Sequence, residues 1–167
     1  MLTELQNYLQ RIENLRGQIS DLIAAMPIEA LNWRPIEGGN DHVINSLAVL
    51  AVHVAGAEHS WMAEVIAGRP KTRRREAEFA AQVDDPAELM ALLDNVADET
   101  RAIFAKLQPA DLDDTREVKG KTIPVRWVIL HVIDHLALHL GHMQITYQLW
   151  QGGQGFHTPR WYDRLPK

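Results

Sequence analysis

Apolar residues recur at steps of three and four along the first part of the chain, which is the spacing of one face of a helix. They are Leu2, Leu5, Leu9, Ile12, Leu15, Ile19, Leu22 and Met26. Thr3 can cap the start of this helix, and Pro27 ends it. A loop is predicted next, because Pro35 and a glycine pair at 38 and 39 interrupt the chain.

The same periodicity predicts three more long helices. The second spans about residues 43–67 and ends before a glycine and a proline. Asp85 is a suitable cap for the third helix, with Pro86 as its first helical residue, and the fourth spans about residues 125–150. In the polar connections we expect one helical turn near residues 76–81 and a small β-hairpin near 118–123.

Four long helices without a clear sheet are typical of an all-α protein, and we predict a four-helix bundle. The long linkers after the second and third helices indicate crossover connections. At 167 residues, the chain has the length of a single domain, which we place at residues 1–167. The pattern leaves the order and handedness of the helices open.

Composition excludes several classes of function. The chain has no cysteine, so any metal must be held by imidazole, carboxylate or water, and we expect a cytoplasmic protein. The net charge of −5 argues against nucleic-acid binding, and no apolar run is long enough for a membrane span. The basic run Arg69–Arg75 is followed at once by glutamates, and we interpret it as a solvated approach to a helix, with a phosphate or anion contact as the alternative.

Four of the eight histidines share one face of the fourth predicted helix: His131, His135, His139 and His142. At 100° per residue they occupy an arc of about 80°, which we expect to face the bundle interior. Buried imidazoles each need partners for a donor and an acceptor, and a metal ion would satisfy the acceptors. Spacing alone allows either the pair 131/135 or the pair 135/139 to share an ion.

His53, at the edge of the apolar face of the second helix, is the candidate for a third ligand. His59 lies more than 100° away on the same helix, and we expect it to meet solvent. We assign His42 a capping or surface role and place His157 in the tail. Glu58, five residues beyond His53, should point well away from it.

Four stretches resemble the DinB-like superfamily, which includes bacillithiol- and mycothiol-dependent S-transferases and isomerases. They are residues 31–35 (LNWRP), 46–53 (SLAVLAVH) with Glu58 and Trp61 after it, 74–79 (RREAEF), and 127–142 (WVILHVIDHLALHLGH). The last stretch is the most specific. The resemblance covers most of the chain.

The resemblance implies a four-helix bundle with one divalent metal ion and three protein ligands, matching His53, His135 and His139. Some members have Glu at the place of His135. The resemblance leaves His131 and His142 outside the ligand set, and we expect them to line the site. It identifies neither a catalytic residue nor a thiol-binding residue.

Three imidazoles with an open fourth position are typical of a catalytic metal site. Zinc is the first expectation, with nickel or iron as alternatives. A low-molecular-weight thiol, which must come from outside a chain without cysteine, would be activated there for an S-transferase reaction on a small-molecule substrate. The alternatives are a metal-dependent hydrolase, or a non-catalytic metal-binding stress-response protein. A homodimer is also considered, through the first helix or through Trp161 and Tyr162 in the tail.

Overall fold

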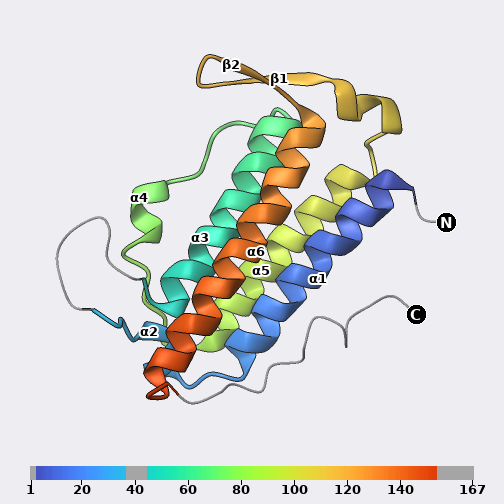
Figure 1. Cartoon of the computed structure of the whole chain (residues 1–167). Helices are drawn as coiled ribbons and strands as arrows, with labels where there is room; N and C mark the ends of the chain where they lie inside the picture. The colour runs from blue at the N-terminus through green and yellow to red at the C-terminus, as the bar shows by residue number, and fades with distance from the viewer. Residues whose placement is uncertain (1–2, 37–44, 154–167) are drawn as a thin grey trace.

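The long helices pack side by side as a bundle in the computed structural model, which describes residues 3–36 and 45–153 (Figure 1). They are α1 (Glu4–Ala24), α3 (Leu47–His59), α5 (Pro86–Phe104) and α6 (Val125–Trp150). The predicted all-α four-helix bundle is therefore confirmed.

The order of the helices around the bundle follows from which pairs touch. Both α1 and α3 pack against α5 and against α6, so α1 lies diagonally opposite α3, and α5 lies diagonally opposite α6. The colours in Figure 1 show that α1 and α6 run one way and α3 and α5 the other. Because α3 and α5 are parallel neighbours, their connection must return along the bundle, which confirms the crossover predicted after the second helix. The crossover predicted after the third helix is wrong, because α5 and α6 are antiparallel and their connection stays at one end of the bundle.

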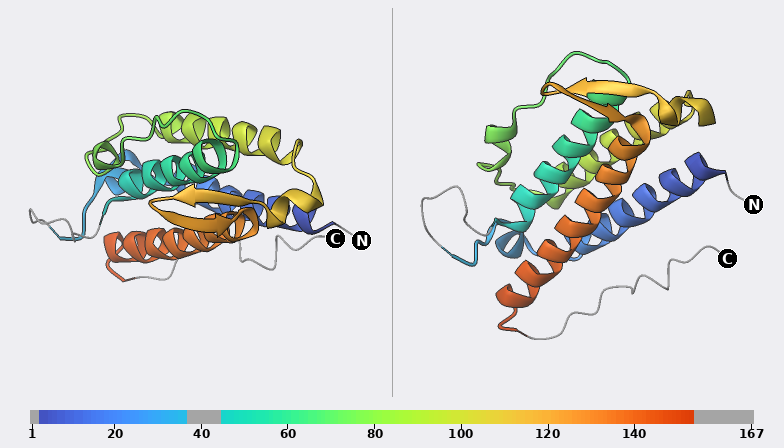
Figure 2. Two further views of the ribbon diagram at one scale, coloured as in Figure 1. Left: turned by 90° about the horizontal axis from the view of Figure 1, so that it is seen from above. Right: turned by 45° about the horizontal axis from the view of Figure 1, so that its top comes forward.

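Shorter elements occupy the connections. They are α2 (Ile28–Asn32), the π-helix η1 (Ser60–Ile66) that continues α3, α4 (Arg75–Glu78), the 3-10 helix η2 (Pro109–Asp113), β1 (Thr115–Val118) and β2 (Lys121–Pro124). The strands form an antiparallel hairpin across one end of the bundle (Figure 2). Its turn needs two residues with positive φ, Lys119 at 52° and Gly120 at 74°, and glycine adopts this conformation without strain. The hairpin is confirmed and is longer than predicted.

Caps fix the starts of the long helices. The Thr3 hydroxyl accepts the N–H of Gln6 at 3.3 Å, and Asp85 caps α5 by accepting an N–H at 2.8 Å. The second predicted helix begins later than expected, because the Ser46 hydroxyl accepts the N–H of Val49 at 3.2 Å and caps the helix there. Residue 43, its expected start, lies outside the described residues.

The apolar face of α1 is used up inside the bundle. Four of its periodic positions, Ile12, Leu15, Ile19 and Leu22, are at most 2% exposed and belong to the central core, whereas Leu9 is only partly buried. Most of this face is therefore occupied by contacts inside the bundle. The homodimer stays a prediction, and Trp161 and Tyr162 lie outside the described residues.

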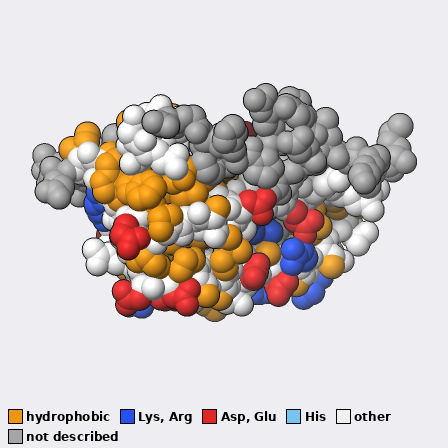
Figure 3. Space-filling view, turned by 90° about the horizontal axis from the view of Figure 1, so that it is seen from below, with side chains coloured by type: hydrophobic (Ala, Val, Ile, Leu, Met, Phe, Trp, Pro, Cys, Tyr) orange, Lys and Arg blue, Asp and Glu red, His pale blue; other side chains and the backbone are white. Residues whose placement is uncertain are grey.

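The outer face of α6 keeps large hydrophobic side chains in solvent. Trp127, Leu130, Leu138, Ile145 and Leu149 are each more than two-fifths exposed. Seen from below, the molecule gathers hydrophobic side chains on one part of its surface beside a mixture of charged ones (Figure 3). Within the described ranges, no helix combines the length and the apolar character that a membrane span requires.

One ion pair lies inside the core. Arg16 of α1 donates to the carboxylate of Glu58 on α3, through Nε at 3.2 Å and through Nη2. Thr100 of α5 donates its hydroxyl to the same carboxylate at 2.6 Å. All three side chains are buried, so this cluster joins three helices away from solvent, and Glu58 points away from His53 as expected.

Candidate metal centre

His53 lies near the middle of α3, a helix that is buried on nearly every side. It does not lie at the edge of a single apolar face as expected, because α4, α5 and α6 all pack around α3. His53 itself is 9% exposed. Packing from several directions therefore holds the backbone of His53 and fixes the position from which its imidazole extends.

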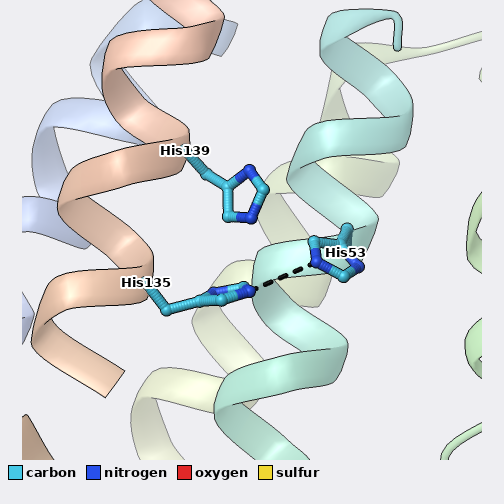
Figure 4. Close-up of side chains that lie close together, drawn as sticks. All are labelled: His53, His135 and His139. Atoms are coloured by element: carbon cyan, nitrogen blue, oxygen red, sulfur yellow. Dashed lines mark hydrogen bonds between the residues drawn. The ribbon is translucent and has the colours of Figure 1, made fainter. Parts of the chain in front are cut away.

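His135 and His139 project from successive turns of α6 toward His53 (Figure 4). One nitrogen from each of the three rings can be chosen so that all three lie within 4.8 Å of one another. Nε2 of His53 is 3.2 Å from Nε2 of His135. Two nitrogens bound to one zinc at tetrahedral angles would be about 3.3 Å apart, so this pair already has the spacing of a shared ion.

Burial keeps these imidazoles neutral. Desolvation lowers the pKa of His135 to about 3 and that of His139 to about 4, and repulsion from the neighbouring imidazoles adds to it. Burial also lowers the pKa of His53, although Glu78 opposes the shift. Neutral imidazoles have a free lone pair on one nitrogen, so the donor set fits a divalent ion of the zinc, nickel or iron type.

A buried carboxylate lies behind His53. Nδ1 of His53 is 2.8 Å from Oε2 of Glu78, on α4, so His53 donates to it and turns Nε2 toward α6. Arg73 donates to both oxygens of Glu78, through Nε at 2.6 Å and Nη2 at 2.9 Å. Gly56, one turn after His53, leaves space for the carboxylate. The second nitrogen of His53 is therefore occupied.

Neither the burial of Glu78 nor its pairing with Arg73 was predicted from the sequence. The basic run was interpreted as solvated, but the Arg73 side chain is 16% exposed and pairs with a Glu78 side chain at 6%. A carboxylate on a four-residue helix has no periodic pattern to reveal its burial. The one available signal was the mixture of arginines and glutamates in residues 74–79, which the resemblance to known proteins already singled out.

His131 and His142 flank the cluster in different ways. His131 stacks on Trp127 with ring centroids 5.0 Å apart and meets the ring of Trp61 at 4.8 Å. His142 is exposed, with its Nδ1 3.4 Å from Nδ1 of His139. Their expected role of lining the site without binding the ion stays a prediction.

The expectation that the whole histidine face points into the bundle interior is wrong. His131, His135 and His139 are half-buried and His142 is exposed. The reason is that the histidine face lies at the edge of the interface between α6 and α3, where side chains are partly exposed to solvent. The cluster is therefore open on one side.

The other histidines do not join the cluster. His59 was expected to meet solvent, but its ring is 28% exposed and held by Glu99 at 2.6 Å from Nδ1 and Thr72 at 2.9 Å from Nε2. The reason is that α5 packs beside α3 and brings Glu99 next to His59. His42 and His157 lie outside the described residues.

A surface groove of about 330 Å³ adjoins the cluster on the side of His139. Its lining combines polar groups with apolar side chains: Asn45, Leu50, His139, His142, Ile145, Thr146 and Leu149. A small molecule in this groove would touch one imidazole of the cluster directly. The groove therefore reaches the cluster at His139.

Comparison with known proteins agrees with this picture. A family model described as mycothiol S-transferase, a DinB-like family, matches residues 8–152. A crystal structure of a conserved protein from Enterococcus faecalis superposes with a TM-score of 0.73 at 16% identity, covering 91% of this chain and 99% of that one. At this identity the likeness shows the fold alone. No curated protein matches the chain significantly.

Proposed function

The chain belongs to the mycothiol S-transferase family, and from that premise we propose that it is a metal-dependent enzyme that transfers a low-molecular-weight thiol to an electrophilic small molecule. The observation that carries the proposal is the convergence of three imidazole nitrogens within 4.8 Å at a place open to a groove. Three protein ligands with an accessible fourth position are the arrangement of catalytic, rather than structural, zinc sites.

His53, His135 and His139 hold one divalent ion in this proposal. Zinc is the first candidate, and nickel or iron would also accept three imidazoles. Because all three ligands are neutral, they leave the charge of the ion undiminished. When bound, the ion supplies a positive charge that lowers the pKa of a thiol at the open position.

The chain's own residues prepare the reaction in three ways. Depressed pKa values keep the imidazoles of His135 and His139 unprotonated, so no proton competes for their lone pairs at neutral pH. The partly exposed edge of the α3–α6 interface admits a thiol. The thiol must come from outside, because the chain has no cysteine. Leu50, Ile145 and Leu149 give the groove an apolar wall that suits the carbon skeleton of an electrophile.

In the transfer, the thiol sulfur forms a bond to an electrophilic carbon and the leaving group departs with the bonding electron pair. The thiol proton leaves to solvent through the open side of the cluster. An electrophile that adds the thiol across a double bond takes that proton back. Either version consumes one thiol and one electrophile for each thioether formed.

The test combines metal removal with product analysis. Metal-free and zinc-reloaded protein would be incubated with mycothiol, bacillithiol, glutathione or cysteine and a panel of electrophiles, and thioethers would be measured by mass spectrometry. We expect thioether formation that zinc restores and that His135→Ala abolishes. Zinc-dependent cleavage of esters or amides without thiol use would replace the proposal with a hydrolase. Absence of turnover in metal-loaded protein with every thiol, ester and amide would favour a metal-binding protein without catalysis.

A further inference from the structure

The three histidines of the cluster are not equally supported. His53 donates its Nδ1–H to Glu78 at 2.8 Å. Among the described residues, neither His135 nor His139 pairs with a carboxylate, and Nδ1 of His139 faces only another imidazole, 3.4 Å away. The cluster therefore has one imidazole whose rotation and tautomer are fixed from behind.

Glu78 is itself held in place by Arg73 and by the backbone of α3. Arg73 donates one N–H to each of its oxygens, at 2.6 and 2.9 Å, so the carboxylate plane is fixed by a two-point contact. The backbone of α3 at Gly56 also lies against this pair. A Cβ built on Gly56 would overlap Oε1 of Glu78, approach its Cδ to 3.1 Å and lie 3.5 Å from Nε of Arg73.

We propose that Glu78 is the positioning residue of the metal centre, and that Arg73 and Gly56 hold it against His53. The carboxylate keeps His53 as the tautomer with hydrogen on Nδ1, so that the lone pair of Nε2 points at His135 and His139. Carboxylates that orient ligating histidines in this way raise the basicity of the ligand and increase metal affinity. The inference rests on the proposed metal site but not on the proposed reaction.

The role of Arg73 is electrostatic as well as geometric. A lone carboxylate behind His53 would add negative charge to the site and offset part of the charge of an ion. The guanidinium of Arg73 balances that charge while the hydrogen bond to His53 is kept. Glu78 can therefore orient the ligand without making the site anionic.

Gly56→Ala is the sharpest test, because the usual effect of the substitution on the helix is favourable while its proposed effect on zinc binding is unfavourable. Alanine in a helix interior normally stabilises it relative to glycine. If Gly56 makes room for Glu78, the added methyl group displaces the carboxylate and zinc affinity falls about 10–100-fold. Gly141→Ala is the matched control, because Gly141 also lies in a long helix but a Cβ there meets nothing within 4 Å. Zinc affinity would be measured by competition with a chelator, and helix content by circular dichroism.

A second pair of variants separates positioning from simple burial of charge. Glu78→Ala should reduce zinc affinity about 10–100-fold, and Glu78→Gln less, because the amide oxygen can still accept from Nδ1. Glu99→Ala is the control, since it removes a carboxylate 2.6 Å from the other histidine of α3, His59, and should leave zinc affinity unchanged.

Nitrogen-15 NMR of the metal-free protein measures the tautomer of His53 directly and independently of turnover. The wild type should show His53 with hydrogen on Nδ1, and Glu78→Ala should shift it toward the other tautomer. Unchanged tautomer and zinc affinity in folded Glu78→Ala, or a Gly56→Ala protein that binds zinc as tightly as wild type, would overturn the inference. If wild-type protein binds no zinc, the metal site itself fails, and the tautomer measurement still decides whether Glu78 positions His53.

Discussion

Two buried glutamate–arginine pairs involve α3, one through Glu58 on the helix itself and one through Glu78 packed beside it, and they differ mainly in their third partner. Glu58 pairs with Arg16 in the core and also accepts the hydroxyl of Thr100 at 2.6 Å. Glu78 pairs with Arg73 beside α4 and accepts Nδ1–H of His53 at 2.8 Å. Both carboxylates are nearly excluded from solvent, at 2% and 6% exposed.

The third partner decides what each pair can do. Thr100 ends the first network, so the Glu58 pair only joins α1, α3 and α5. His53 continues the second network, because its other nitrogen is free to face the histidines of α6. Burying an ion pair costs desolvation energy in both places. We infer that the first pair serves the fold and the second serves the metal site.

The largest contrast should come from the proposed ligands. His53→Ala, His135→Ala and His139→Ala should each lose the ion, because two imidazoles remain where three are needed. His59→Ala is the control, since His59 shares α3 and also has a carboxylate partner, yet lies outside the cluster. Elemental analysis of the purified proteins measures the difference. Full metal occupancy in His135→Ala would rule out this ligand set.

The core pair should show the opposite pattern, a loss of stability with the metal site intact. Glu58→Ala leaves Arg16 as a buried charge without its carboxylate, and breaking such pairs costs about 3–5 kcal/mol. Urea unfolding should show this loss, while zinc affinity of the protein that remains folded should match wild type. A large fall in zinc affinity without a loss of stability would mean that the two networks are coupled.

Acid should destabilise the metal-free protein through the histidine cluster, and His135 should contribute to this loss of stability. The pKa of His135 falls from 6.5 to about 3 on folding, so the unfolded chain binds more protons than the folded chain between these values. Its contribution to stability is full above about pH 6.5 and is lost as pH falls toward 3. When the pH is lowered from 7.5 to 5, the urea midpoint of unfolding should therefore fall further in the wild type than in His135→Ala. Equal drops would contradict the assigned pKa shift.

The smallest effects should come from the flanking histidines. His131→Ala removes a ring stacked on Trp127, and His142→Ala removes an exposed ring beside His139. Both variants should keep one ion per chain and change zinc affinity only slightly, because neither ring belongs to the cluster of three. Loss of the ion from either variant, measured by elemental analysis, would show that this residue is a ligand.

Local signals carried the prediction of the fold. Thr3 and Asp85 cap the helices where the sequence indicated, and Pro124 immediately precedes α6. The apolar periodicity of α1 matched its buried face. By contrast, α3 is apolar on nearly every side, so its pattern could not show which way His53 points.

Long-range contacts limited the prediction of the site. The spacing of His135 and His139 is a property of one helix and was visible in the sequence. Glu78 comes from a four-residue helix that reaches His53 across 25 positions of the chain. Likewise, Glu99 reaches His59 across 40 positions. Local periodicity does not indicate which elements will pack together, so these partners appeared only in the folded structure.

Anomalous X-ray diffraction from zinc-loaded crystals tests the central claim most directly. We predict one strong peak per chain, about 2.0–2.1 Å from one nitrogen each of His53, His135 and His139, with a fourth position facing the groove. A peak bound by His131 or His142, or a fourth protein ligand that closes the open position, would contradict the account.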